Sequence, residues 1–466
     1  MSFLWCLDGR FCRVSRTRIA GLATLAIAML MLAAPAGLAA CAAVHSPWVA
    51  TWGAAMVATD SAGASPGHAP DLTGLTLREI VHTSVGGQQV RVWLSNRFGT
   101  EPLHIGAVHI AIAARGRVGA NPDGIPNESA IQAGTDRPLV FDNMGSVVIP
   151  PGAEVVSDPV ALDVPALTDI DISIYFPDHT IATTEHADAQ QTSYAAHGDV
   201  VGAPSLTGKS WPIHSWYVLT GVDVYAPGDS AVIAFGDSIT DGWQSTPNKN
   251  HRWPDYLASR LAAEAVRRNN GVLGVVNVGI SGNRVLRYGW GPDGVSRINR
   301  DILARDGARY VIILEGINDI GRFTSDHPPP YGDLTQRLEA GIAQIVTQAH
   351  LHCMEVIGAT MTPYQGSAYY TVAGDQVRQS VNKWIRTSPI FDGVADFDNA
   401  VRAPQNPLHL AARFDSGDHL HPNDAGYKAM ANAIDLGLFA KKHQAQPLMR
   451  PEAKTVVRMH EPRNDR

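Results

Sequence analysis

A serine stands directly after a short, wholly apolar segment of the chain. Residues 231–235 (Ala-Val-Ile-Ala-Phe) contain no polar alternation, as is typical of a buried parallel strand. Gly236, Asp237 and Ser238 follow at once. The carboxyl end of such a strand lies at the crevice where open α/β sheets bind ligands. A helix that begins there would favour a developing negative charge, so Ser238 is a candidate nucleophile.

The tripeptide Gly-Asp-Ser alone has little specificity, because Asp and Ser are also common helix caps. A second copy at residues 228–230 precedes the apolar run instead of following it, and we set it aside. Two other patterns also lack the required context. Residues 63–67 fit Gly-x-Ser-x-Gly without a preceding strand, and residues 289–294 fit Gly-x-Gly-x-x-Gly but are typical of a loop.

Four short blocks resemble, in their order, those of the SGNH (GDSL-type) hydrolase family. The first is residues 236–242, and the second is residues 278–284 (Val-Gly-Ile-Ser-Gly-Asn-Arg) after another apolar run. Residues 316–319 (Gly-Ile-Asn-Asp) and 418–421 (Asp-His-Leu-His) complete the set. The resemblance covers about residues 230–438. It implies a serine ester hydrolase that forms an acyl-enzyme and needs no metal or organic cofactor.

The chemistry of these residue types fits the roles that the family implies. Serine is a poor nucleophile until a base removes its proton, and His421 can do this and then protonate the leaving alcohol. Asp418 can hold the imidazole in the useful tautomer. For the oxyanion hole, the family implies the backbone N–H groups of Ser238 and Gly282 and the side-chain amide of Asn318.

One departure from the family pattern leaves an alternative open. His419 stands where the family often has a small residue, so two histidines flank one leucine. Together with Asp415 or Asp418, such a pair could bind a metal ion. The Asp-x-x-His spacing instead favours His421 as the base and leaves His419 as a pocket or surface residue.

Two further polar residues, Asp241 and Arg284, flank the predicted site. We expect them either to shape substrate recognition or to serve as a helix cap and a surface ion pair.

Three functions remain open for this set of residues. The first is an exported hydrolase of acyl esters, with acetylated carbohydrates as one class because the first block resembles those of sugar esterases. The second is an O-acyltransferase that passes the acyl group from the same site to a sugar hydroxyl. The third is an inactive surface protein that binds carbohydrate, although a binding module has no need of all four blocks.

Two kinds of secondary structure are expected to position the blocks. Residues 47–226 contain short alternating runs between Gly, Pro, Asn and Asp clusters, which predicts a β-rich, sandwich-like domain. Residues 228–440 alternate apolar strands with helical stretches, which predicts a flavodoxin-like, doubly wound parallel sheet. The strands are expected at 231–235, 272–278, 310–314 and 356–359, and the helices at 253–267, 333–350, 376–386 and 423–438.

Residues 1–43 are typical of a secretory signal, with a basic start, an apolar run and small residues at the end. Residues 38–41 also resemble a bacterial lipobox, in which Cys41 would carry a lipid anchor. Ordinary cleavage nearby would leave Cys41 incidental, and an uncleaved anchor is a third option. We expect a secreted or cell-envelope protein, whose polar residues 441–466 form a flexible tail.

Composition excludes several other classes of protein. The 466 residues are 45% hydrophobic and 17% charged, enough apolar material for the cores of two or three domains. The net charge of -7 gives no basic surface for nucleic acid, so we expect a small-molecule or glycan ester as partner. Cys353 is the only cysteine after the signal and Cys41, and we expect a buried free thiol there.

Overall fold

The computed structural model describes residues 46–59, 69–114, 129–206, 210–268, 271–322 and 333–440. The predicted signal, Cys41, the pattern at 63–67 and the predicted tail lie outside these residues. Within the described part of the chain, no helix has the length and apolarity needed to cross a membrane. Cys353 is half-buried and disulfide-bonded, so the prediction of a buried free thiol was wrong.

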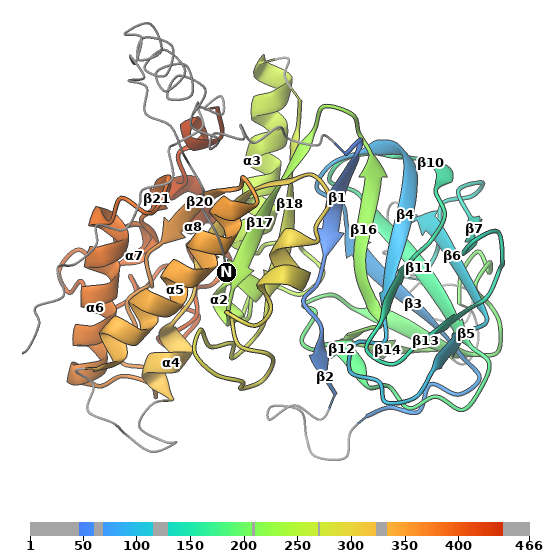
Figure 1. The fold of residues 1–466 in the computed structure, drawn as a ribbon, viewed down its shortest axis with the longest axis horizontal. Coiled ribbons are helices and arrows are strands. Elements are labelled where there is room, and N and C mark those ends of the chain that lie inside the picture. Colours follow the sequence, from blue (N-terminus) through green and yellow to red (C-terminus); the bar gives the residue numbers. More distant parts are fainter. Residues whose placement is uncertain are drawn as a thin grey trace, which may run out of the picture. The chain divides into compact units, whose positions relative to one another are not determined.

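Five parallel strands form the sheet that carries the candidate site (Figure 1). Their order, β18-β17-β19-β20-β21, is the 2-1-3-4-5 arrangement of flavodoxin-like folds, which confirms the predicted fold class. The central strands are buried on both faces, as their continuous apolar runs predict. The strands are β17 (Ser230–Gly236), β18 (Leu273–Gly279), β19 (Ala308–Leu314), β20 (Glu355–Ala359) and β21 (Gly393–Ala395).

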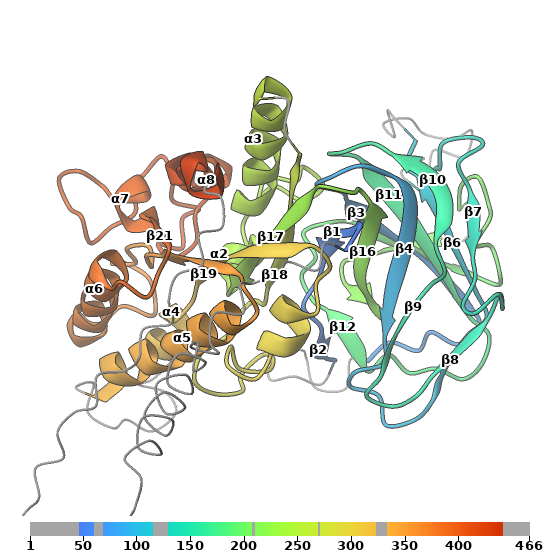
Figure 2. The ribbon, with the colours of Figure 1, turned by 45° about the horizontal axis from the view of Figure 1, so that its top comes forward.

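Helices cover both faces of this sheet. Figure 2 shows α3, α7 and α8 on one side of it and α4, α5 and α6 on the other. The helices are α2 (Ser238–Asp241), α3 (Trp253–Arg268), α4 (Ile317–Gly321), α5 (Leu334–Leu351), α6 (Val372–Thr387), α7 (Phe397–Val401) and α8 (Asp424–Ala433). The helix predicted at 423–438 ends earlier than expected, because α8 stops at Ala433. The side chain of Asp435 then accepts the N–H of Gly437, and a separate 3₁₀ turn begins.

The β-rich region consists of antiparallel sheets, as predicted. One sheet has the order β1-β16-β4-β10, with β9 also paired to β4, and a second has the order β14-β13-β3-β11-β6-β7. A small sheet, β15-β12-β2, and the pair β5-β8 complete it. The strands are β1 (Trp48–Gly53), β2 (Val57–Ala58), β3 (Leu75–His82), β4 (Gly87–Ser95), β5 (Leu103–Ile105), β6 (Ala107–Ile112), β7 (Arg137–Leu139), β8 (Val147–Ile149), β9 (Glu154–Val156), β10 (Val160–Val164), β11 (Asp169–Phe176), β12 (Thr184–His186), β13 (Ser193–His197), β14 (Ser210–Ile213), β15 (Trp216–Tyr217) and β16 (Leu219–Tyr225).

The antiparallel strands lie directly against the parallel sheet, with β1 beside β18. Arg305, just before β19, donates hydrogen bonds of 3.1 and 2.8 Å to the carbonyl oxygens of Ala54 and Thr220. The N–H of Val275 in β18 is 2.9 Å from Ser84 Oγ, which follows β3. Hydrogen bonds to buried backbone groups thus join the two regions.

Gly236 joins β17 to α2 at a point where no side chain fits. A Cβ atom there would lie 2.1 Å from Thr240 Oγ1 and 2.6 Å from the carbonyl oxygen of Leu314. Leu314 belongs to the neighbouring strand β19, so a change of side-chain rotamer cannot relieve that contact. The turn that presents Ser238 therefore depends on a glycine at this position.

We expect Gly236→Ala to lower the free energy of unfolding by about 1–3 kcal/mol, the usual cost of overpacking. Urea denaturation measures the change. Gly145→Ala is the matched control, since a Cβ atom there would have no neighbour within 4 Å. Equal stability of the two variants would show that the turn at Gly236 is looser than described.

Candidate active site

Ser238 begins α2, immediately after β17. The side chain of Asp237 caps this short helix by accepting the N–H of Ile239 at 2.9 Å. Gly242 ends the helix in the left-handed region, with φ of 100°. The strand, the cap and the glycine together hold Ser238 at the carboxyl edge of the sheet, where it is 7% exposed.

His421 lies between Ser238 and Asp418. Its Nε2 atom is 2.8 Å from Ser238 Oγ, and its Nδ1 atom is 2.6 Å from Asp418 Oδ2. A carboxylate only accepts, so Nδ1 carries the proton, and Nε2 is free to accept the serine O–H. The structure therefore brings the three residues predicted to be catalytic into one hydrogen-bonded chain.

Asp418 is held as an anion by the groups around it. Its Oδ1 atom accepts the N–H of Leu420 at 2.9 Å, the N–H of His421 at 2.8 Å and the hydroxyl of Ser416 at 3.1 Å. Partial burial acts to raise the pKa of Asp418, but the hydrogen bonds and charge of His421 outweigh burial and hold that pKa well below its usual value. An ionised carboxylate can stabilise the imidazolium that forms when His421 takes a proton.

The start of α8 fixes the position of His421. Asn423 caps this helix, with its side-chain oxygen 3.1 Å from the N–H of Gly426. Within α8, the buried hydroxyl of Tyr427 donates to the carbonyl oxygen of Trp243 at 2.5 Å. Trp243 directly follows α2 and its glycine cap, so this bond ties the helix behind His421 to the turn that carries Ser238.

His419 does not reach Ser238. Its Nδ1 atom is 2.5 Å from Asp415 Oδ2, and its side chain is 48% exposed. Each of the two histidines thus has its own aspartate. Across the described residues, no group of three or more His, Cys, Asp or Glu side chains is arranged to hold a metal ion.

Gly282 lies in the loop of residues 280–286, here called the glycine loop. Its φ of 75° falls in the left-handed region, and a Cβ atom would lie 2.8 Å from the ring of Trp290. Only glycine fits this position without strain. Ser281, the preceding residue, donates its N–H and its hydroxyl to Asp241 Oδ2 at 3.1 and 2.8 Å.

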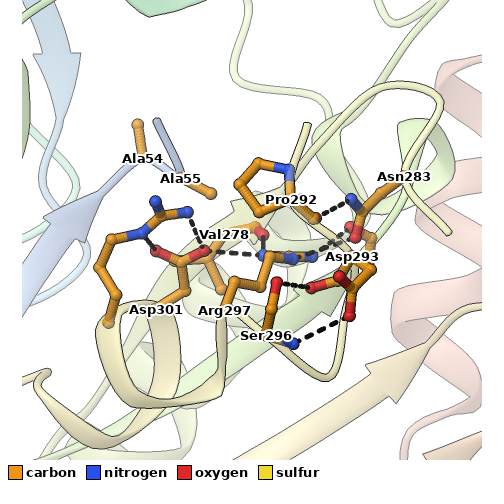
Figure 3. A network of polar contacts seen from close by, with 12 residues as sticks. Ala54, Ala55, Val278, Asn283, Pro292, Asp293, Ser296, Arg297 and Asp301 are labelled. Atoms are coloured by element: carbon orange, nitrogen blue, oxygen red, sulfur yellow. Dashed lines mark hydrogen bonds and ion pairs between the residues drawn. The ribbon is translucent and has the colours of Figure 1, made fainter. Parts of the chain in front are cut away.

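Buried charged groups hold the rest of the glycine loop. Asp319 accepts the N–H groups of Val285 and Leu286 at 2.8 and 3.1 Å. Arg297 donates to the side-chain oxygen of Asn283 at 3.0 Å and to the carbonyl oxygen of Val278 at 2.6 Å (Figure 3). The same guanidinium also donates to the carbonyl oxygen of Gly236 and pairs with Asp301.

Asn318 presents a buried donor that has no partner among the described residues. Within that part of the chain its Nδ2 atom makes no hydrogen bond, and its Oδ1 atom accepts the hydroxyl of Tyr369 at 3.2 Å. That hydroxyl in turn accepts the Nε–H of Arg322 at 2.9 Å, and the Arg322 guanidinium lies 4.8 Å from the centre of the Trp290 ring. A buried, unpaired donor is costly, so its presence marks a place where an acceptor is expected to bind.

Several residues that shape the site were not predicted from the sequence. Tyr369 and Arg322 orient Asn318, and neither belongs to one of the four blocks. Trp290 lies in the loop 289–294, whose glycine pattern carried no useful signal. Asp241 was expected to shape substrate recognition or to act as a helix cap, and its partner His186 was not singled out.

A cluster of buried carboxyl groups lies beneath these residues. Burial raises the pKa of Asp237 and Glu315, and the two interact electrostatically with each other and with Asp319. Burial also raises the pKa of Asp319 to about 6, although the N–H groups of Val285 and Leu286 act to lower it. The folded protein therefore keeps protons that the unfolded chain releases at lower pH.

We expect Asp319→Asn to change how stability depends on pH. Unfolded Asp319 loses its proton near its ordinary pKa of 3.8, whereas folded Asp319 keeps it until about 6. The stability that comes from this proton is complete below pH 3.8 and is lost as the pH rises through 6. Urea denaturation across this range should show the wild-type free energy of unfolding falling relative to that of the variant. Parallel profiles would contradict the raised pKa.

Comparisons with known proteins bear on this site. A search of curated proteins finds no match. Weak structural similarities include a mutant of Axe2, an acetyl-xylooligosaccharide esterase from Geobacillus Stearmophilus (24% identity, TM-score 0.33, 44% of this chain and 91% of that one). Another is a GDSL-like lipase from Bacteroides thetaiotaomicron (18% identity, TM-score 0.32, 45% of this chain and 88% of that one).

These structural similarities are too low to support an argument about activity, and the assignment comes from the sequence family instead. Residues 232–434 match the family described as GDSL-like Lipase/Acylhydrolase. They span β17 to α8 and include all three members of the chain Ser238–His421–Asp418. This segment, which is less than half of the chain, matches the GDSL-type (SGNH) hydrolases, and the match supports a carboxylic ester hydrolase.

Proposed function

We propose that this protein is an exported serine esterase in which Ser238, His421 and Asp418 form the catalytic triad. The hydrogen-bonded chain from Ser238 Oγ through His421 to Asp418 is the observation that carries the proposal. In the first step, Ser238 Oγ attacks the ester carbonyl carbon while His421 Nε2 takes its proton. Asp418 keeps the ring oriented and balances the charge of the imidazolium.

The tetrahedral intermediate carries a negative oxygen that needs donors already in place. We assign these donors to the N–H of Ser238, the N–H of Gly282 and Nδ2 of Asn318. The unpaired state of Asn318 Nδ2 supports this role, because a ground-state partner would have to be displaced before the oxyanion could bind. Tyr369 holds the other end of the amide, which points Nδ2 away from Tyr369.

The second half of the reaction releases the products. The intermediate collapses, His421 gives its proton to the leaving alcohol, and the acyl group remains on Ser238. His421 then takes a proton from water, whose oxygen attacks the acyl carbon. When this second tetrahedral intermediate collapses, His421 returns the proton to Ser238 Oγ and the acid leaves. No step requires a group beyond these residues and water.

The proposed substrates are acyl esters, with acetylated carbohydrates as the first class to test. The resemblance of the first block, residues 236–242, to those of sugar esterases supports this choice. Export follows from the sequence of residues 1–43, and a lipid on Cys41 would anchor the protein to a membrane. Both remain proposals that rest on sequence alone.

We expect Ser238→Ala and His421→Ala to abolish ester hydrolysis, and His419→Ala to keep most of it. Acetylated glycans, p-nitrophenyl esters and phospholipids form the substrate panel, with sugar acceptors added to detect acyl transfer. His419→Ala is the matched control because His419 pairs with Asp415, whereas His421 is the histidine bonded to Ser238. Near-wild-type turnover by folded Ser238→Ala protein would refute the mechanism. Strong inhibition by EDTA would instead support the alternative of a metal site at His419 and His421.

Substitutions at Asn318 distinguish a role in catalysis from a role in substrate binding. An interaction made only in the transition state raises kcat and leaves KM nearly unchanged. Asn318→Ala should therefore lower kcat roughly a hundred- to a thousand-fold with little change in KM. Asn318→Asp should be at least as harmful, since a carboxylate would face the negative oxygen. A normal kcat with a lowered melting temperature would make Asn318 a structural residue only.

A further inference from the structure

A histidine of the antiparallel region reaches the far end of α2. His186, the last residue of β12, places its Nε2 atom 3.1 Å from Asp241 Oδ1. Its Nδ1 atom is 2.9 Å from the carbonyl oxygen of Ala55. Both side chains of the pair are 5% exposed, so the contact is closed to bulk water.

The partners of His186 require a doubly protonated ring. A carbonyl oxygen and a carboxylate oxygen both accept, and a neutral imidazole has only one N–H to donate. Burial acts to lower the pKa of His186, and the charge of Arg252 acts in the same direction. The charge and hydrogen bond of Asp241 outweigh these effects and raise that pKa. The contact is therefore a buried imidazolium–carboxylate pair.

The other oxygen of Asp241 holds the glycine loop. Oδ2 accepts both the N–H and the hydroxyl of Ser281, the residue before Gly282. Asp241 also ends α2, the four-residue helix that Ser238 begins. One carboxylate thus links the two backbone segments whose N–H groups are assigned to the oxyanion hole.

We propose that His186 is a positioning residue for the oxyanion hole, and that the antiparallel region takes part in catalysis through it. His186 fixes the carboxylate of Asp241, and Asp241 fixes the peptide between Ser281 and Gly282 relative to α2. This inference rests on the proposed esterase mechanism. It gives residues 47–226 a role in the chemical step, separate from any role in holding substrate.

The surroundings of the pair argue against a ligand site there. A cavity of about 30 Å³ borders it, lined among others by His186, Asp241, Trp216 and Arg252. This volume holds at most about two water molecules, so no ester fits. The Trp216 ring lies 5.4 Å from the His186 ring and closes one side. The pair therefore serves to hold the backbone at Ser281 in place.

The first test is His186→Gln, which keeps one donor and removes the charge. We expect kcat to fall about ten- to a hundred-fold with KM little changed, a smaller loss than removal of a direct oxyanion donor. His109→Gln is the matched control, because His109 pairs with Asp136 at 2.9 Å in the same antiparallel region. That control should keep the wild-type kcat.

A second measurement separates positioning from a general loss of folding. A boronic acid forms a tetrahedral adduct on the serine, so its affinity should weaken by about the factor that kcat loses. In a double-mutant cycle, His186→Gln with Asp241→Asn should lose little more than the worse single variant. If His186→Gln does not fold, Ser281→Ala tests the same link, since it removes only the hydroxyl bond to Asp241.

The outcomes distinguish this inference from the proposed mechanism. Wild-type kcat and boronic acid affinity in folded His186→Gln protein would overturn the positioning role, even if its melting temperature falls. Additive losses in the double-mutant cycle would also overturn it, because the two residues would then act independently. Activity in Ser238→Ala would instead overturn the mechanism on which the inference rests.

Discussion

The site depends on hydrogen bonds between buried carboxylates and the backbone of the glycine loop. Residues 280–286 lie outside helix and strand, so no regular ladder fixes them. Asp241 holds one end through Ser281, and Asp319 holds the other through two consecutive N–H groups. A carboxylate can accept several N–H donors, and a buried one is stable only when they are supplied. The carboxylates and the loop therefore fix each other's positions. The backbone N–H of Gly282 is held in one orientation as a result.

Burying so much charge at the end of a sheet has an energetic cost. Arg297 and Asp301 have no exposed side-chain surface, and burial shifts the pKa of Glu315 upward. Buried ion pairs of this kind often contribute little to stability, because desolvation offsets their attraction. Here they fix the relative positions of the strand ends and the glycine loop. Arg297 joins the ends of β17 and β18 to Asn283, and its guanidinium lies 3.7 Å from the centre of the Phe235 ring.

The parallel sheet and the antiparallel strands support the site together. Arg305 reaches from the loop before β19 to backbone carbonyls of the antiparallel region, and Asp301 lies between Arg305 and Arg297. On the other side of α2, His186 reaches Asp241. Two polar links therefore run from the antiparallel strands to the segments that surround Ser238. Their burial strengthens each bond and makes an unpaired group costly, which favours a single arrangement of the site.

The sequence by itself determined the features that depend on neighbours along the chain. The continuous apolar run before Ser238 places it at a strand end, and the three-residue spacing of Asp418 and His421 suffices for their hydrogen bond. Only the tertiary structure decided which distant residues hydrogen-bond to the polar side chains of the site. Tyr369 is 51 residues from Asn318 and His186 is 55 from Asp241, and neither stands in a local pattern. The hydrogen-bond partner of a buried polar side chain is set by which residues pack beside it. Because these residues are distant along the chain, the pairing leaves no periodicity or spacing in the sequence.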